Sequence, residues 1–229
     1  MSPSRELLTD LDLVEEGLEL GPWKLTLLRP RQAEALLDED AFEHEEFLPY
    51  WAELWKSGLA LAEEVVAREV RGLRIVELGC GLGVPALAAS LAGAEVLATD
   101  WSPTAIALLA ENARRNDVRL ETAIVAWAHA DALVERTPWD LVLAADVLYE
   151  RRNVDELLEL LPRLGSTVLL ADPGRPHAKE FWTKAAGAWE LEQSGIVYAL
   201  TAAGTTDARA AASRPVPRES AARSRARRP

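Results

Sequence analysis

A closely spaced set of three glycines after an apolar segment constrains this chain most strongly. Residues 77–83 read ELGCGLG, directly after the largely apolar residues 73–76 and directly before the helix-like sequence of residues 84–91. Glycine at every second position lets the backbone make a tight strand-to-helix turn and approach a ligand closely, which a Cβ atom would obstruct. We therefore expect a small-molecule pocket at this turn.

The spacing of these glycines bears on the class of cofactor. A dinucleotide site requires G-x-G-x-x-G with a pyrophosphate at the helix N-terminus, but here the third glycine comes one residue early and Val84 stands in its place. Glu77 also precedes the first glycine by two residues. This arrangement resembles motif I of the class I S-adenosylmethionine-dependent methyltransferases, E/D-x-G-x-G-x-G. A nicotinamide or flavin enzyme is the alternative.

Length and composition limit the class of protein. A chain of 229 residues fits one α/β domain with an appendage. We find neither an apolar stretch of 18 residues nor a signal-peptide pattern at the N-terminus, and therefore expect a cytoplasmic protein. Cys80 is the only cysteine, which excludes internal disulfides and cysteine metal clusters, and a small buried filler is its expected role.

Charge is distributed unevenly along the chain. The net charge is −12, and the last 29 residues carry seven arginines against Asp207 and Glu219, a balance of +5, so residues 1–200 hold about −17. An acidic body disfavours nucleic acid as a substrate and suits a cationic partner such as a lysine side chain, although it also simply keeps a protein in solution.

Alternation of β-rich runs with helical patterns predicts βαβ units and a parallel sheet. The predicted strands are Leu73–Glu77, Glu95–Thr99, Arg119–Val125, Leu141–Ala145 and Thr167–Ala171. The predicted helices are Pro85–Ala92, Pro103–Asn116 and Val154–Leu161, with Ser102 as the N-cap of the second. The ends of these strands bring Gly79, Asp100, Trp127 and Asp146 to the carboxyl edge of the sheet, where open α/β folds bind ligands.

The two ends of the chain differ from this core. We expect residues 1–70 to be an N-terminal extension, with an exposed strand or hairpin at 21–28, an acidic loop or frayed helix at 31–46, and an aromatic segment at 48–55 that leads into an amphipathic helix and caps the pocket. Residues 71–200 form the core. The basic tail at 201–229 has one large aliphatic residue, and we expect it to be disordered.

Aspartates and aromatic residues follow the predicted strands. Asp100 ends the second strand, 23 residues after Glu77, where such folds place a carboxylate on the ribose hydroxyls. Trp101 and Trp127 are candidates to flank the adenine, with an exposed anchor and a core residue as their alternatives. Asp131 is placed to reach the exocyclic amine. The three histidines have no metal-ligand spacing, so no metal is expected.

Asp146 and Tyr149 close the fourth strand. Their spacing of three residues puts two polar groups on one side of a helical turn, beside the expected methyl donor. Methyl transfer from a sulfonium requires mainly that the nucleophile be positioned and its deprotonation supported. A carboxylate such as Asp146 can orient an amine.

A family resemblance rests on these motifs together. The sequence LPYWAELWKSGLALA at 48–62, the glycine turn, Asp100, the pair Asn112 and Asn116, Trp127 and WDLVLAADVLYE at 139–150 are similar to the seven-strand methyltransferase-like family. Characterised members are mostly protein-lysine methyltransferases, including those acting on the electron transfer flavoprotein β subunit. Bacterial relatives are often labelled nicotinamide N-methyltransferase-like. The resemblance covers about residues 18–185.

The resemblance implies roles for individual positions. Trp55 and Gly58 would form the wall near the methionine end of the cofactor, with Glu77, Gly79, Cys80 and Gly81 beneath it. Asp100 and Trp101 would lie along the ribose and adenine, Trp127 would contact the adenine, and Asp146 and Tyr149 would lie at the substrate entrance. The family usually ends with a strand pair that completes the sheet. Here residues 189–200 are few, so we expect a short or missing last strand.

The resemblance therefore implies an α/β protein with a Rossmann-like sheet of about seven strands that binds S-adenosylmethionine and methylates an amine. A protein lysine is the expected acceptor. The alternatives are a small-molecule N-methyltransferase and a non-catalytic cofactor-binding module. We expect a monomer, with no nucleic-acid or membrane partner.

Overall fold

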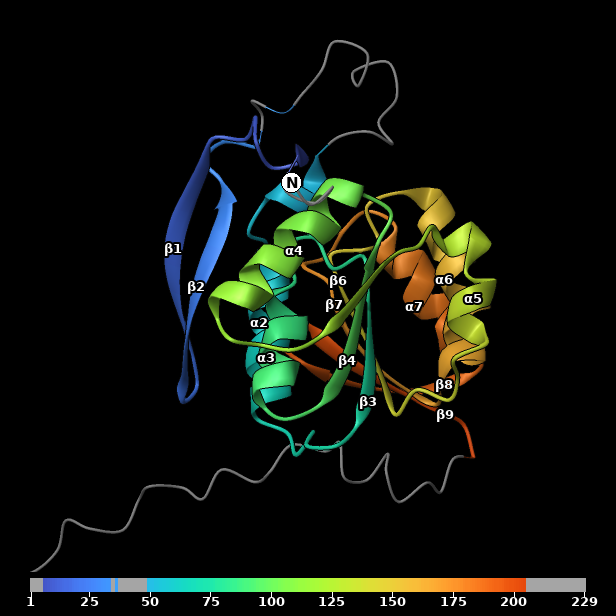
Figure 1. The fold of residues 1–229 in the computed structure, drawn as a ribbon. Helices are drawn as coiled ribbons and strands as arrows, with labels where there is room; N and C mark the ends of the chain where they lie inside the picture. The colour runs from blue at the N-terminus through green and yellow to red at the C-terminus, as the bar shows by residue number, and fades with distance from the viewer. Residues whose placement is uncertain (1–5, 34–35, 37–48, 205–229) are drawn as a thin grey trace, which may run out of the picture.

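The structure, a computed structural model, describes residues 6–33, 36 and 49–204 (Figure 1). Most of the predicted acidic loop at 31–46 and residues 205–229 of the predicted disordered tail lie outside the described residues. Within the described ranges, no helix is long and apolar enough to cross a membrane.

Seven strands form one mixed sheet in the order β5-β4-β3-β6-β7-β9-β8, and all neighbours are parallel except those of β9. The strands are β3 (Arg74–Leu78), β4 (Glu95–Asp100), β5 (Glu121–Ile124), β6 (Leu141–Ala145), β7 (Thr167–Ala171), β8 (Trp189–Ser194) and β9 (Val197–Ala202). The central strands are buried on both faces, as their continuous apolar sequences require. The predicted seven-strand α/β fold is confirmed.

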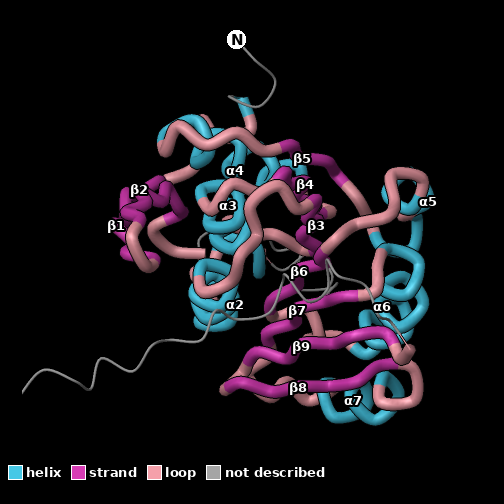
Figure 2. The backbone as a smooth tube through the Cα atoms, turned by 90° about the horizontal axis from the view of Figure 1, so that it is seen from below, coloured by secondary structure: helices cyan, strands magenta, loops and turns pink. Residues whose placement is uncertain are grey.

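Helices cover the two faces of this sheet, as Figure 2 shows from below. One face carries α2 (Lys56–Val66), α3 (Val84–Leu91) and α4 (Pro103–Arg115), and the other carries α5 (Asp131–Val134), α6 (Arg151–Leu164) and α7 (Ala178–Ala185). Each face has its own apolar core. Ser102 caps α4 as predicted, since its Oγ accepts from the Ala105 N–H at 3.3 Å.

The predicted strands and helices of the core all form. β6 and β7 have the predicted bounds, whereas the predicted strand at 119–125 shortens to β5 and the predicted helix at 154–161 extends by three residues at each end to form α6. Sequence analysis did not predict α5 or α7.

The expectation of a short or missing last strand is wrong. β9 pairs antiparallel with all five residues of β7, and β8 pairs with all six residues of β9. This strand pair needs few residues because Gly195, with φ of 61°, and Ile196 make a two-residue turn between the strands. The first residues of the predicted tail, Thr201 and Ala202, belong to β9.

A separate hairpin packs beside the sheet. β1 (Leu13–Leu20) pairs antiparallel with β2 (Trp23–Pro30), so of the strand or hairpin predicted at 21–28 a hairpin forms. The predicted exposure is wrong, because Leu25, Leu27 and Leu28 are buried. The free edge of β2 is held by Asn112 of α4 and by Asn116, the C-cap residue of this helix. Asn112 accepts from the Leu28 N–H at 2.7 Å and donates to the Leu28 carbonyl at 2.9 Å, and Asn116 bonds Thr26 in the same way at 2.8 and 2.9 Å.

Candidate active site

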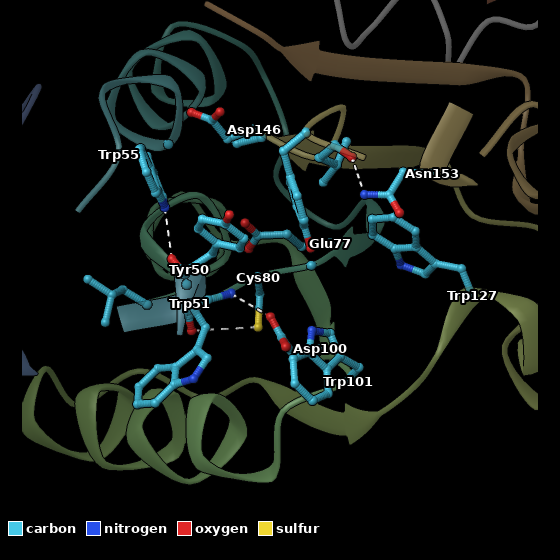
Figure 3. A pocket seen from close by; sticks show the side chains of 18 of the residues that line it. Tyr50, Trp51, Trp55, Glu77, Cys80, Asp100, Trp101, Trp127, Asp146 and Asn153 are labelled. Carbon is cyan, nitrogen blue, oxygen red and sulfur yellow. Dashed lines mark hydrogen bonds between the residues drawn. The ribbon is translucent and has the colours of Figure 1, made fainter. Parts of the chain in front are cut away.

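A cavity of about 380 Å³ opens at the carboxyl ends of the strands (Figure 3). It lies at the point where the strand order reverses: from β3 the chain continues to β4 and β5 on one side of β3, and then crosses to β6 on its other side. With the exception of Asp131, the residues predicted for the cofactor and for catalysis line this one cavity, namely Trp55, Gly58, Glu77, Gly79, Cys80, Gly81, Asp100, Trp101, Trp127, Asp146 and Tyr149. Its size is that of a small-molecule site.

The glycine turn between β3 and α3 forms the floor of the cavity. Gly81 has φ of 50°, and a Cβ atom there would lie 3.1 Å from the backbone carbonyl oxygen of Trp51. Gly83 has φ of 71°, and its Cβ would lie 2.3 Å from the side chain of Leu109 in α4. Glycine at position 81 therefore lets the turn approach the backbone of Trp51 closely, and glycine at position 83 lets α3 pack closely on α4.

The carboxylate of Asp100 holds this turn in place. Its Oδ2 accepts from the Gly81 N–H at 2.9 Å, and its Oδ1 accepts from the Ser102 N–H at 2.9 Å. Burial raises the pKa of Asp100, while the backbone hydrogen bonds oppose the shift. The Trp101 N–H also hydrogen-bonds this carboxylate, which has about four lone pairs, so Asp100 can still accept a hydrogen bond from a ligand in the cavity.

Glu77 lies beneath the turn and is almost completely buried. Its Oε2 accepts from the backbone N–H of Ala86 in the first turns of α3 at 2.8 Å. Burial raises the pKa of Glu77 well above its ordinary value, and the charge of Asp100 adds to that shift. Glu77 thus ties the end of β3 to the helix that follows it.

Cys80 is buried within the turn, as a small filler would be. Burial, followed by the charges of Asp100 and Glu77, raises the pKa of its thiol well above the ordinary value. A thiol that keeps its proton is a poor nucleophile and a poor metal ligand. Among the described residues no group of three or more His, Cys, Asp or Glu side chains is placed to hold a metal ion, and His44 lies outside those residues.

Asp146 follows β6 in a left-handed backbone conformation, with φ of 59°. Its buried carboxylate is engaged on both oxygens. Oδ2 accepts from the hydroxyl of Ser57 at 2.5 Å, and Oδ1 accepts from Nε of Arg175 at 2.5 Å. A non-glycine residue with positive φ persists where the surrounding contacts fix it, and such residues concentrate at functional sites.

Aromatic side chains form one wall of the cavity. The rings of Tyr50 and Tyr149 lie 4.9 Å apart between centroids, and Nε1 of Trp55 donates to the Tyr50 carbonyl at 2.8 Å. Tyr149 is partly buried, and burial, then Glu150 and Asp100, raises its pKa to about 12. The phenol therefore stays protonated near neutral pH.

Two tryptophans flank the opposite end of the cavity. Trp127 lies against the floor, since a Cβ on Gly79 would be 3.2 Å from its ring, and Trp101 is 41% exposed. His129 also lines this end.

Asp131 does not line the cavity; it is an exposed residue whose carboxylate pairs with Arg163 at 3.0 Å, so the expectation that it reaches an adenine amine is wrong. The short helical turn of residues 127–129 carries the chain away from the cavity before Asp131.

Several residues of the site had no individual predicted role. Ser57 and Arg175 hold Asp146, the ring of Tyr50 packs at a tilt against that of Tyr149, and Asn153 donates to the Val147 carbonyl at 2.9 Å. Tyr50 and Ser57 lie within the motif at 48–62, which was a usable signal. Nothing in the sequence marks Arg175 or Asn153.

Comparisons with known proteins point to one family. The family model described as "Lysine methyltransferase" matches residues 49–183. The human electron transfer flavoprotein beta subunit lysine methyltransferase is 34% identical over 161 residues, which are 67% of this chain and 60% of that protein. The Xenopus laevis protein of the same name is 36% identical over 136 residues, 56% of this chain and 53% of that protein. The chain thus spans between half and two thirds of the length of these relatives.

Solved structures agree on the fold. The T. thermophilus 16S rRNA N2 G1207 methyltransferase, in complex with AdoMet and guanosine, has a TM-score of 0.60 at 16% identity and covers 83% of this chain and 50% of its own. The magnesium protoporphyrin IX methyltransferase of Synechocystis with bound SAM has a TM-score of 0.54 at 15% identity and covers 75% and 98%. The fold is that of the class I methyltransferases. With the family model matching more than half of its residues, the chain belongs to the lysine methyltransferase family.

Proposed function

We propose that this protein is an S-adenosylmethionine-dependent methyltransferase that methylates a lysine side chain of a protein. The observation that carries the proposal is the convergence of the glycine turn, Asp100, Asp146 and Tyr149 on one cavity at the switch point of the sheet. Family membership and the names of the curated relatives support the choice of lysine.

The residues present fit the cofactor. Asp100 would accept from the ribose hydroxyls with its remaining lone-pair capacity, and Trp127 and Trp101 would flank the adenine. Gly58 and Gly79 line the cavity and would border the methionine portion beside Trp55. At Gly58 there is open space for it, because a Cβ atom there would meet nothing within 4 Å. Glu77, Cys80 and Gly81 would shape the floor. When bound, S-adenosylmethionine supplies a methyl group on a positively charged sulfur.

The acceptor side is suited to an amine. The aromatic faces of Tyr50 and Tyr149 would attract a cation. Asp146 would fix the direction of approach, and the neutral phenol of Tyr149 would take part in hydrogen bonds rather than remove a proton. Positioning of the amine is thus the main task of these residues.

The segment at 49–55 would act as the cap predicted for the N-terminal extension, because Tyr50, Trp51, Leu54 and Trp55 all line the cavity. The division at residue 70, the cytoplasmic location and the monomeric state belong to the same proposal. The acidic charge of the chain is consistent with a monomer, and its single cysteine is consistent with the cytoplasm.

Calorimetric titration tests the cofactor. We expect saturable binding of S-adenosylmethionine and S-adenosylhomocysteine and none of NAD. Binding of NAD alone would overturn the assignment of the cavity and point to hydride chemistry.

Transfer of a labelled methyl group tests the acceptor. Purified electron transfer flavoprotein β subunit and nicotinamide are offered in parallel with tritiated S-adenosylmethionine, and label on lysine is identified by mass spectrometry. We expect label on the protein and loss of most transfer in Asp146→Ala. Label on nicotinamide alone would replace the protein acceptor by a small amine, and cofactor binding with no transfer to either would favour the non-catalytic module.

A further inference from the structure

Arg175 connects three separate parts of the acceptor side. It lies in the loop between β7 and α7, its Nε donates to Asp146 at 2.5 Å, and its guanidinium carbon lies 4.9 Å from the ring centroid of Trp55. Trp55 belongs to the segment that enters α2, and Asp146 follows β6. One side chain thus contacts both a wall of the cavity and the residue expected to direct the acceptor.

The backbone of the loop is fixed by Asp172. Oδ1 of Asp172 accepts from the N–H groups of Gly174 and Arg175 at 2.7 and 2.9 Å. Gly174 has φ of 95°, a backbone conformation that favours glycine. Because its backbone is anchored, the Arg175 guanidinium reaches Asp146 from a defined direction.

The position of Asp146 needs such a support. Its side chain is only 6% exposed, and its backbone has a left-handed conformation that a non-glycine residue rarely adopts. Ser57 supplies a neutral hydrogen bond, and Arg175 supplies the positive charge that pairs with this buried carboxylate. Guanidinium is also suited to stacking on an aromatic face, which an ammonium does less well.

From this geometry we infer that Arg175 is a positioning residue for methyl transfer: it holds the Asp146 carboxylate and the Trp55 ring in the arrangement that receives the acceptor amine. The inference rests on the proposed function, since it concerns the acceptor side of the same site. Arg175 does not line the cavity, so it acts through Asp146 and Trp55 rather than on the cofactor.

Variants of Arg175 test this role in the full chain, with purified electron transfer flavoprotein β subunit as the acceptor. In Arg175→Gln we expect kcat/KM for the acceptor to fall about tenfold or more while the Kd of S-adenosylhomocysteine changes less than about threefold. Arg175→Lys keeps the charge but not the stacking, and should recover part of the loss. Arg114→Gln, which removes an exposed arginine paired with Glu111 in α4, is the matched control and should behave as wild type.

A double-mutant cycle separates positioning from a loss of folding. If Arg175 acts through Asp146, Arg175→Gln should have little further effect in an Asp146→Asn background. Wild-type kinetics in Arg175→Gln, or equal losses in both backgrounds, would overturn the inference, as would loss of S-adenosylhomocysteine binding in step with activity. Failure of the proposed function is a distinct result, because wild type itself would then transfer no methyl group.

Discussion

Asp100 and Gly81 are joined by a hydrogen bond of 2.9 Å that links the end of β4 to the glycine turn after β3. The carboxylate thereby fixes the backbone of the cavity floor and still has lone-pair capacity to accept from a ligand. A residue expected from sequence to contact a ribose is thus also a structural part of the turn.

Substitution of Gly81 by valine should abolish binding of S-adenosylmethionine. Its backbone has φ of 50°, and a Cβ would lie 3.1 Å from the Trp51 carbonyl oxygen, so the turn and the segment above it must both shift. Calorimetry measures the loss. Gly187→Ala is the control, because the nearest atom to a Cβ there is 3.6 Å away. Undiminished affinity in Gly81→Val would reject the role of the turn.

Gly58 offers a test that separates binding from stability. We expect Gly58→Leu to weaken binding of S-adenosylmethionine about tenfold or more by filling the cavity. The free energy of unfolding should stay the same or rise by up to about 1 kcal/mol, since glycine is a poor helix former. Gly58→Ala should bind normally, because a Cβ at this position meets nothing within 4 Å. Urea unfolding and calorimetry on the same samples provide both measurements.

Replacement of Tyr149 by phenylalanine tests whether the phenol is a base. With a pKa of about 12 the phenol is neutral throughout the working range, so only a hydrogen bond is lost. A neutral hydrogen bond contributes about 1 kcal/mol, or about fivefold in rate. We expect a loss of that size and an unchanged pH profile between pH 6 and 10. A loss of about 10²-fold or more, together with a vanished inflection, would show proton transfer instead.

Glu77 should make the unliganded protein less stable as the pH rises. Its pKa is raised in the folded state, so the folded protein retains this proton at pH values where the unfolded chain has lost it. Stability from this group is complete below the ordinary value of 4.5 and is lost as the pH rises through the folded pKa. Glu77→Gln retains an oxygen that can accept from Ala86 and has no charge to bury.

We therefore expect the unfolding free energy of Glu77→Gln, relative to wild type, to increase from acid to neutral pH in urea titrations. Glu192→Gln, at an exposed position of β8, serves as the comparison and should show no such trend. A difference between Glu77→Gln and wild type that is independent of pH would contradict the expected shift.

Asn112 anchors the hairpin, and its loss should be costly. Asn112→Ala leaves the buried N–H and carbonyl of Leu28 without this partner, which we expect to reduce the free energy of unfolding by about 2–4 kcal/mol. The equivalent bonds of Asn116 to Thr26 are exposed, so Asn116→Ala should cost about 1 kcal/mol. Equal effects of the two substitutions in urea unfolding would rule out the buried pairing as the main contribution.

The fold was predictable because its signals are local. Apolar runs set the strands, Ser102 and the following proline set the start of α4, and the glycine turn placed the cavity. The similarity to the seven-strand methyltransferase-like family is confirmed by the family model over residues 49–183. The roles of individual residues in binding and catalysis stay predictions.

Partners distant in sequence could not be predicted in this way. Ser57 and Arg175 lie 89 and 29 positions from Asp146, and only the packing of α2 and the β7–α7 loop brings them together. The last strand pair was underestimated for a related reason, since its length depends on the two-residue turn at Gly195. Asp131 was misplaced because position after a strand does not fix where a side chain points once a helical turn intervenes.

Asn112 and Asn116 also protect the hairpin from other chains. A strand edge with unsatisfied backbone groups is a template for intermolecular pairing and aggregation. Along β2 that edge is occupied at Thr26 and Leu28 by side-chain amides. β1 carries Glu15, Glu16 and Glu19, each in an ion pair, and charged side chains on a strand discourage the pairing of a further strand. The hairpin can therefore lie outside the main sheet without recruiting a neighbour.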